Sequence, residues 1–251
     1  MPDKARDILI LAPAGLKTFL RRFGALQAIR KQHKDAYILA LVPAALFDFA
    51  RDSGCFDEVV TGWRGFLKRR FTHVYDLRGG LRVPVIFRFL RGRPVFAPPP
   101  QDSAPDLAFL TRVANCPAAF DVPKPYVLLL AGVSPRHPEK RWPPRRYAAL
   151  AMKLAREGFH PVLLGTDAKT EMSENLARFC PQAVDLCGRT SLFDIAALAR
   201  EAAAALGNDT GAAALVALTG CPTQVIAADD SVAAVYRNFS PRRERGHAVR
   251  A

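Results

Sequence analysis

The stretch Ala202-Ala203-Ala204-Ala205-Leu206-Gly207-Asn208-Asp209-Thr210-Gly211 places an apolar run directly before a polar turn flanked by glycines, and a second apolar run follows. This pattern predicts a buried strand over residues 202–206 and a helix over residues 210–218. Glycines permit close approach of the backbone to a ligand, and the first N–H groups of a helix have no intrahelical acceptor. The turn is therefore typical of an anion-binding site, although many α/β turns contain Gly and Asp.

The second half of the chain alternates apolar strands with amphipathic helices. We predict further strands over residues 126–130, 161–164, 183–186 and 223–227. We predict further helices from Pro143 to Gly158 and over residues 169–179 and 192–200, the last opened by a capping-box pattern at Ser191 and Asp194. This alternation predicts a doubly wound parallel sheet whose ligand-binding turns lie at the carboxyl ends of its strands.

The first half follows the same pattern less regularly. We predict strands over residues 7–12, 37–42, 58–60 and 72–75, and helices over residues 18–32, 44–52 and 81–90. Prolines cluster between residues 93 and 125, which favours a linker near residues 118–125. We therefore expect an α/β protein with two domains, residues 1–122 and residues 123–251.

The chain is basic, with a formal net charge of +13. Residues 1–124 hold 20 Lys and Arg against 11 Asp and Glu, and residues 125–251 hold 16 against 12, so the first half carries most of the excess. A basic surface suits nucleic acid, phospholipid or a phosphorylated glycan, or it belongs to a protein that is merely basic. The sequence contains no recognised nucleic-acid-binding motif, so we expect no nucleic-acid partner.

The five cysteines are odd in number and lack a C-x-x-C spacing. This argues against a disulfide framework or a zinc site and favours a reducing compartment. The apolar start of the chain lacks a signal-peptide cleavage motif, and the apolar stretch 36–47 is too short to span a bilayer. We expect a cytoplasmic protein, with peripheral contact to the inner membrane as an open option.

An ordered series of motifs resembles the family-9 glycosyltransferases, the ADP-heptose:lipopolysaccharide heptosyltransferases. The series consists of residues 138–143 with Arg146-Tyr147, residues 161–165, residues 185–192, residues 207–211 and the turn Gly220-Cys221-Pro222. The first half matches more loosely, at residues 24–30, 56–59 and 74–77. The resemblance implies a GT-B-like architecture, in which two Rossmann-like doubly wound domains face a cleft. The acceptor then belongs to the N-terminal domain and the nucleotide-sugar to the C-terminal one.

The resemblance also implies an inverting transfer from a nucleotide-sugar, most simply an ADP-linked donor, with no other cofactor and no metal. Lys140 would neutralise charge that develops on the leaving diphosphate. The expected donor-binding residues are Ser134, Lys140, Glu171, Asp209, Thr210 and Gly211. The alternative interpretations are a surface lysine at 140, a solvated helix residue at 171 and a helix cap at 209.

Three departures from the family pattern bear on catalysis. Thr18 stands at the position of the family's presumed Asp base, and a hydroxyl cannot act as a base near neutral pH without help. Ala-Ala-Ala at residues 212–214 replaces the usual Pro-Met-His, and Ala-Ala-Asp-Asp at residues 227–230 replaces a phenylalanine-containing turn. Either Asp76 serves as the base, or the protein is a non-catalytic paralogue that binds a nucleotide-sugar or glycan.

Three cations of the first half are candidates for the acceptor site. Lys17 and Arg21 lie four residues apart on one predicted helix face, with Arg22 adjacent. They suit an anionic glycolipid or another envelope glycan, or they form an ordinary solvated face. Residues 63–71 mix cations and aromatic side chains, which suits a membrane interface or a nucleic-acid backbone, or else an ordinary surface loop.

Overall fold

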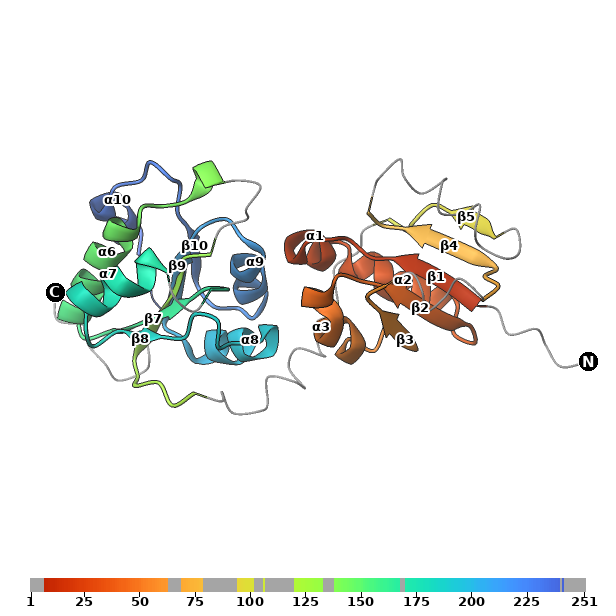
Figure 1. The fold of residues 1–251 in the computed structure, drawn as a ribbon, viewed down its shortest axis with the longest axis horizontal. Coiled ribbons are helices and arrows are strands. Elements are labelled where there is room, and N and C mark those ends of the chain that lie inside the picture. The colour runs from red at the N-terminus through yellow and green to blue at the C-terminus, as the bar shows by residue number, and fades with distance from the viewer. Residues whose placement is uncertain are drawn as a thin grey trace, which may run out of the picture. The chain divides into compact units, whose positions relative to one another are not determined.

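The computed structural model describes residues 7–62, 69–78, 94–101, 106, 120–132, 138–167, 170–239 and 241. By its internal contacts the chain divides into two compact units, Met1–Phe109 and Leu110–Ala251. Each unit contains one five-stranded sheet, and the strand pairs of both sheets are parallel (Figure 1). The predicted α/β class, with two doubly wound Rossmann-like sheets, is thus confirmed.

The sheet of the first unit has the spatial order β3-β2-β1-β4-β5. Its strands are β1 (Asp7–Leu11), β2 (Tyr37–Leu41), β3 (Glu58–Val60), β4 (His73–Asp76) and β5 (Val95–Ala97). The central strands β1 and β2 are buried over four of their five residues, as continuous apolar runs in a parallel sheet require. The prediction missed β5, a three-residue edge strand between Pro94 and Pro98 whose Val95 and Phe96 are exposed.

Two predicted helices of the first unit are each divided. The helix predicted over residues 18–32 is α1 (Leu16–Arg21) followed by α2 (Phe23–Gln32), with Arg22 at a non-helical ψ of 1° between them. The helix predicted over residues 44–52 is a 3₁₀ turn, η1 (Ala44–Leu46), followed by α3 (Phe47–Asp52). The periodicity cannot reveal the first break, because Phe19 before it and Phe23 after it are both fully buried, with ring centroids 6.0 Å apart. The helix predicted over residues 81–90 lies outside the described residues.

The sheet of the second unit has the order β10-β9-β6-β7-β8. Its strands are β6 (Tyr126–Leu130), β7 (His160–Leu164), β8 (Val184–Asp185), β9 (Ala204–Gly207) and β10 (Thr223–Val225). In chain order within each unit, both sheets therefore read 3-2-1-4-5. In this arrangement the loops diverge between the first and fourth strands, which creates a crevice for ligands at the carboxyl ends. This switch point lies between β1 and β4 in one unit and between β6 and β9 in the other.

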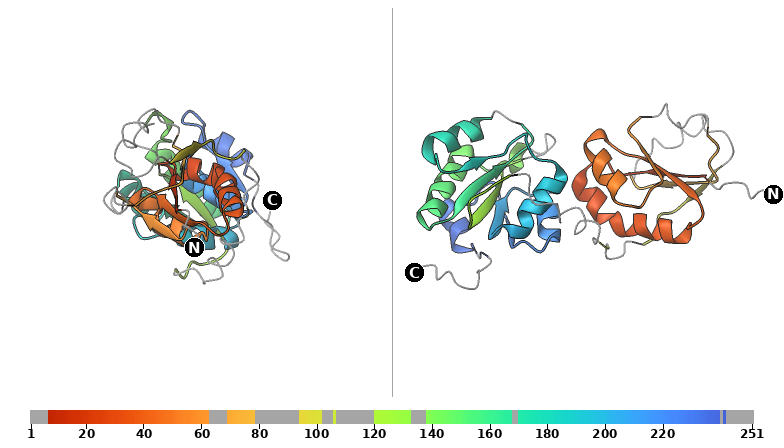
Figure 2. Two further views of the ribbon diagram at one scale, coloured as in Figure 1. Left: turned by 90° about the vertical axis from the view of Figure 1, so that its right-hand side faces the viewer. Right: turned by 90° about the horizontal axis from the view of Figure 1, so that it is seen from below.

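Helices cover both faces of the second sheet (Figures 1 and 2). The helical elements are η3 (Pro138–Lys140), α6 (Pro144–Arg156), α7 (Glu171–Phe179), α8 (Leu192–Glu201), α9 (Gly211–Leu218) and α10 (Val232–Arg237). On one face α6 packs against α7 and α10, and on the other α8 packs against α9. The prediction missed α10, a six-residue helix capped by Ser231.

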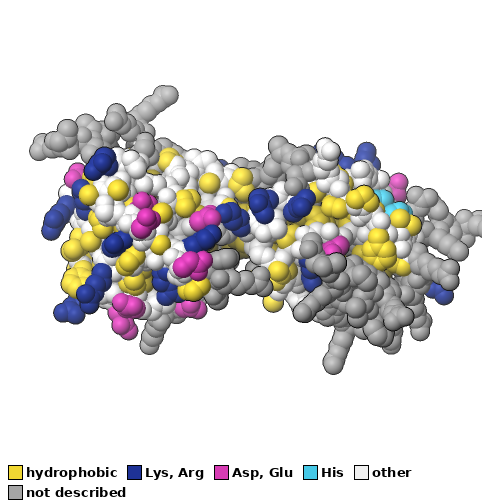
Figure 3. Space-filling model, turned by 90° about the horizontal axis from the view of Figure 1, so that it is seen from above, with side chains coloured by type: hydrophobic (Ala, Val, Ile, Leu, Met, Phe, Trp, Pro, Cys, Tyr) yellow, Lys and Arg dark blue, Asp and Glu magenta, His cyan; other side chains and the backbone are white. Residues whose placement is uncertain are grey.

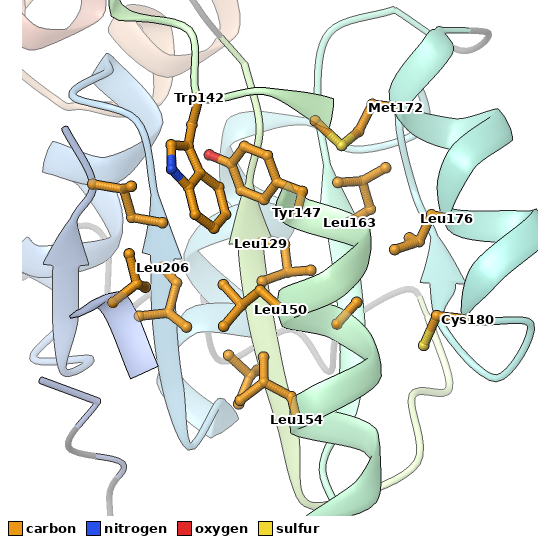
Figure 4. Close-up of a cluster of buried hydrophobic side chains, with 14 of the residues drawn as sticks. Leu129, Trp142, Tyr147, Leu150, Leu154, Leu163, Met172, Leu176, Cys180 and Leu206 are labelled. Carbon is orange, nitrogen blue, oxygen red and sulfur yellow. The ribbon is translucent and has the colours of Figure 1, made fainter. Parts of the chain in front are cut away.

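The main core of the second unit lies between α6, α7 and the sheet (Figure 4). From α6 it contains Tyr147, Leu150 and Leu154, which follow one another along the same face of the helix. Trp142 lies just before α6, is fully buried and meets Tyr147 edge to face at a centroid distance of 4.8 Å. The core therefore reaches the carboxyl ends of the strands, where it fixes the start of α6.

Candidate functional site

The candidate site of the second unit lies where β6 and β9 end side by side. Leu130 pairs with Gly207, and the Asn208 N–H continues the ladder by donating to the Leu130 carbonyl at 3.1 Å. A Cβ atom at position 207 would overlap that carbonyl oxygen. The sequence motif attributes its first glycine to close approach of a ligand, but the structure shows that Gly207 accommodates the neighbouring strand.

Asn208 is a fully buried polar side chain at this point. Its Oδ1 accepts a hydrogen bond from the backbone N–H of Trp142 at 3.1 Å. Its Nδ2 donates to the carbonyls of Ala131 and Gly132, each at 3.2 Å. The sequence motif by itself indicates no separate role for Asn208. Its burial could have been predicted from the alternation of side chains along a strand. Residue 208 lies two positions after Leu206 and so faces the core on the same side of the sheet.

A second set of contacts holds the loop that follows β10. The Trp142 indole Nε1–H donates to the Asp230 carbonyl at 2.8 Å. Arg146, in the first turn of α6, donates to the carbonyls of Ala228 and Asp230 at 3.2 and 3.0 Å. The residues between β10 and α10 are therefore fastened to the start of α6, at the same end of the sheet as Asn208.

The predicted donor-binding residues Asp209, Thr210 and Gly211 lie at the amino end of α9. Thr210 is the N-cap, and its hydroxyl accepts from the Ala213 N–H at 3.2 Å. Asp209 is exposed, and Gly211 is the first residue of the helix. The capping role belongs to Thr210, so Asp209 remains a candidate for ligand contact. The N–H groups of the first turn give this edge a positive potential.

The other predicted donor-binding residues lie on neighbouring loops. Lys140 is exposed at the end of η3, two residues before the anchored Trp142. Glu171 is exposed at the first position of α7, which follows β7. Both loops leave the carboxyl ends of strands, so Lys140 and Glu171 share an edge of the sheet with the start of α9. Ser134 lies outside the described residues.

The corresponding switch point of the first unit lies between β1 and β4. Asp76 is the last residue of β4 and accepts a hydrogen bond from the Arg78 N–H at 2.9 Å. The Arg78 side chain donates to the carbonyls of Ala12 and Leu41 at 2.9 and 3.2 Å, and thus ties the residues that end β1 and β2. Burial lowers the pKa of Arg78, and the Asp76 carboxylate opposes this shift.

The remaining candidates lie on α1, the helix that follows β1. Thr18 is its third residue and is half-buried, whereas Lys17 and Arg21 are exposed. Lys17 and Arg21 lie four residues apart within this single helix, so they occupy one face of it. Arg22 is half-buried at the break between α1 and α2. The helix starts beside Ala12, so Thr18 and Asp76 belong to the same edge of the first sheet.

The described side chains offer little for metal or thiol chemistry. Within the described ranges no group of three or more His, Cys, Asp or Glu side chains is placed to hold a metal ion. Cys55, Cys180, Cys187 and Cys221 are buried thiols. Burial raises the pKa of Cys55 to about 11 and that of Cys187 to about 12, so these thiols are poor nucleophiles at neutral pH.

The described side chains on one face of the surface carry charges of both signs. On the face drawn in Figure 3, the described Lys and Arg side chains are spread over both units, and Asp and Glu lie among them on the second unit. Among the helices of the described ranges, none has both the length and the apolarity to cross a bilayer.

Solved structures share the fold. E. coli ADP-heptose lipopolysaccharide heptosyltransferase II superposes with a TM-score of 0.66 at 18% identity, covering 86% of this chain and 83% of that one. A family-9 glycosyl transferase from Veillonella parvula gives 0.66 at 15% identity, covering 89% and 81%. E. coli heptosyltransferase WaaC with ADP gives 0.64 at 16% identity, covering 92% and 96%. At these identities the likeness establishes the GT-B-like fold.

Sequence comparison identifies the family. No curated protein matches the chain significantly. The profile of glycosyltransferase family 9 (heptosyltransferase) matches residues 97–223, which is just over half of the chain. The matched range contains the Asn208 contacts, the start of α6 and the amino end of α9. The chain therefore belongs to glycosyltransferase family 9, the heptosyltransferase family.

Proposed function

We propose that the protein transfers a sugar from a nucleotide donor, most simply an ADP-linked one, to a lipopolysaccharide-type or other envelope glycan. The observation that carries the proposal is the contact of Asn208 with Trp142, which joins the turn bearing Lys140 to the turn at the start of α9. A lysine beside the first turn of a helix suits a diphosphate, because both offer positive potential and hydrogen-bond donors. The ADP bound to one E. coli relative supports the choice of nucleotide.

In the proposed reaction an acceptor hydroxyl attacks the anomeric carbon with inversion. The bond from that carbon to the diphosphate oxygen breaks, and its electron pair stays on the leaving nucleoside diphosphate. Lys140 stabilises the charge that develops there, and no cofactor other than the donor takes part. The acceptor's proton passes to a base, for which Asp76 is the candidate. Its backbone contact with Arg78 holds the carboxylate at the end of β4.

The proposed acceptor and location rest on cations of the first unit. Lys17 and Arg21, with Arg22 beside them, supply positive charge on α1. We propose that they attract an anionic glycolipid or envelope glycan at the cytoplasmic side of the inner membrane. The proposed location is accordingly the cytoplasm, with peripheral contact to the membrane.

One observation favours a second candidate function. Thr18 rather than a carboxylate occupies α1 at the position where the family resemblance expects the base. A protein with an intact donor site and no base binds a nucleotide-sugar without turnover. The alternative is therefore a non-catalytic paralogue that binds a nucleotide-sugar or glycan.

Thermal unfolding with a panel of ligands tests the donor site. ADP, UDP, GDP and ADP-heptose are added separately, and adenosine serves as a control that lacks the diphosphate. A ligand at about 100 times its dissociation constant should stabilise the fold by about 2.7 kcal/mol. A melting temperature that none of these nucleotides shifts at millimolar concentration contradicts the proposal. Detection of a glycosylated product separates the transferase from the non-catalytic alternative.

A further inference from the structure

We infer that Asn208 is a positioning residue, which sets the place of Lys140 relative to the amino end of α9. The inference rests on the proposed donor site and assigns a task within it to a side chain that cannot touch the donor. Asn208 is fully buried, whereas Lys140 and Asp209, on the two segments that it joins, are exposed. It therefore acts on the ligand only through its neighbours.

The chemistry of the partners requires an amide at this position. The backbone N–H of Trp142 can only donate a hydrogen bond, and the carbonyls of Ala131 and Gly132 can only accept one. An asparagine supplies one acceptor and two donors on a single planar group, so all three partners are satisfied at once. A serine, an aspartate or an alanine at position 208 would leave at least one of these buried groups unpaired, which is costly away from water.

Three separate segments meet on this one side chain. Ala131 and Gly132 follow β6, Trp142 lies between η3 and α6, and Asn208 itself lies between β9 and α9. Lys140 ends a short turn closed by the bond from the Arg141 N–H to the Pro138 carbonyl at 3.1 Å. The turn thus passes directly into the anchored Trp142. Loss of the bond from the Trp142 backbone N–H to Asn208 frees the end of this turn, and the position of Lys140 relative to the amino end of α9 is then no longer set by it.

A double-mutant cycle on ADP affinity distinguishes positioning from simple structural support. ADP binding is measured by calorimetry for wild type, Asn208→Ala, Lys140→Ala and the double variant. Loss of a contact to a charged group corresponds to about tenfold or more in affinity, and we expect this from either single change. In the Lys140→Ala background, Asn208→Ala should change the affinity by less than about twofold, because the residue it positions is already absent.

Tyr126→Phe is the matched control. The Tyr126 hydroxyl donates to the Leu198 carbonyl at 2.8 Å, so it too bonds a buried side chain to a backbone carbonyl, but at the opposite end of β6. We expect a lower melting temperature with unchanged ADP affinity. If Tyr126→Phe weakens ADP binding as much as Asn208→Ala does, general instability explains the loss and the inference is wrong.

Asn208→Asp keeps the shape and covers the case in which Asn208→Ala fails to fold. Its carboxylate faces the carbonyls of Ala131 and Gly132 in place of the amide donor, which raises the carboxyl pKa above its ordinary value of about 3.9. ADP affinity relative to wild type should therefore recover as the pH is lowered and the carboxyl regains a donor. A relative affinity that does not change with pH contradicts the inference.

The outcomes separate the inference from the proposed function. If Lys140→Ala weakens ADP binding and Asn208→Ala adds an equal loss in both backgrounds, the donor site stands and the positioning role is overturned. The same holds if Asn208→Ala binds ADP as wild type does. If wild type binds neither ADP nor any other nucleoside diphosphate, the donor site fails, and the inference fails with it.

Discussion

The two sheets have the same strand order, but their switch points are held together in different ways. Between β6 and β9 a buried amide, an indole and a guanidinium join three loops, and the cation Lys140 lies on one of them. Between β1 and β4 the Arg78 side chain joins the ends of β1 and β2, and Thr18 follows on α1. The first arrangement agrees with the family resemblance, and the second departs from it at the base. We therefore expect nucleotide binding and sugar transfer to be separable in this chain.

The largest expected effect concerns the base. If Thr18 leaves the chain without a base, wild type transfers sugar slowly or not at all, and Thr18→Asp should raise the rate constant by about 10²–10⁴-fold, the usual contribution of a general base. Lys17 and Arg21 on the same helix keep the new carboxylate ionised. The measurement is product formation under single-turnover conditions. ADP affinity serves as the control and should be the same in both forms.

Fast transfer by wild type would show that the first switch point does not lack a base. Fast transfer by wild type that survives Thr18→Ala and is abolished by Asp76→Asn would identify Asp76 as the base. In that case the first unit would supply a base from β4 instead of from α1.

The next effect concerns the charge at the second switch point. Lys140→Ala should weaken ADP binding by about 1.5–3 kcal/mol, because a charge-assisted contact is lost. Trp142→Phe should weaken it much less, since that change removes the indole bond to the Asp230 carbonyl and part of the core packing but leaves the backbone bond to Asn208. Calorimetry gives both affinities. Equal ADP affinities for wild type and Lys140→Ala would exclude Lys140 from the site.

A smaller effect tests the packing of β6 against β9. Gly207→Ala should lower the free energy of unfolding by about 1–3 kcal/mol, because the added methyl group overlaps the Leu130 carbonyl. Gly132→Ala is the matched control at the same edge, where an added Cβ meets nothing within 4 Å. We expect it to change stability by less than about 0.5 kcal/mol. Urea denaturation measures both, and equal losses would refute the steric explanation.

The smallest effect separates capping from ligand contact. Thr210 and Ser191 cap α9 and α8 through the same kind of bond, in which the hydroxyl oxygen accepts from the N–H three residues later. Thr210→Ala and Ser191→Ala should each cost about 1 kcal/mol of stability. Only Thr210→Ala should also weaken ADP binding, since Thr210 borders the proposed site. If both changes leave ADP affinity as in wild type, Thr210 is a cap alone.

The sequence predicts most of the fold because the signals for its elements are local. The strands β1, β2 and β6 are continuous apolar runs, and the capping box at Ser191 and Asp194 is present as predicted. The strand β5 and the helix α10 are too short to show a period. The break at Arg22 leaves the apolar face unchanged on both sides, so periodicity cannot locate it.

The candidate site is predictable in part for the same reason. The motifs predicted that Lys140 precedes a helix and that residues 209–211 lie at the start of another, at the carboxyl ends of strands, which is where the structure places them. The inward roles of Gly207 and Asn208 depend on Leu130, Ala131, Gly132 and Trp142, which are far away in the chain. Nothing in a polar turn indicates such partners until the sheet is assembled.

The overlap between a methyl group at position 207 and the Leu130 carbonyl has a consequence for the history of such proteins. A lineage that keeps this sheet is favoured to keep a glycine there, whether or not its members still turn over substrate. Part of the motif at residues 207–211 is thus explained by folding alone. Such a signature can outlast the reaction with which it is associated, and its presence in a genome is evidence of ancestry before it is evidence of an enzyme.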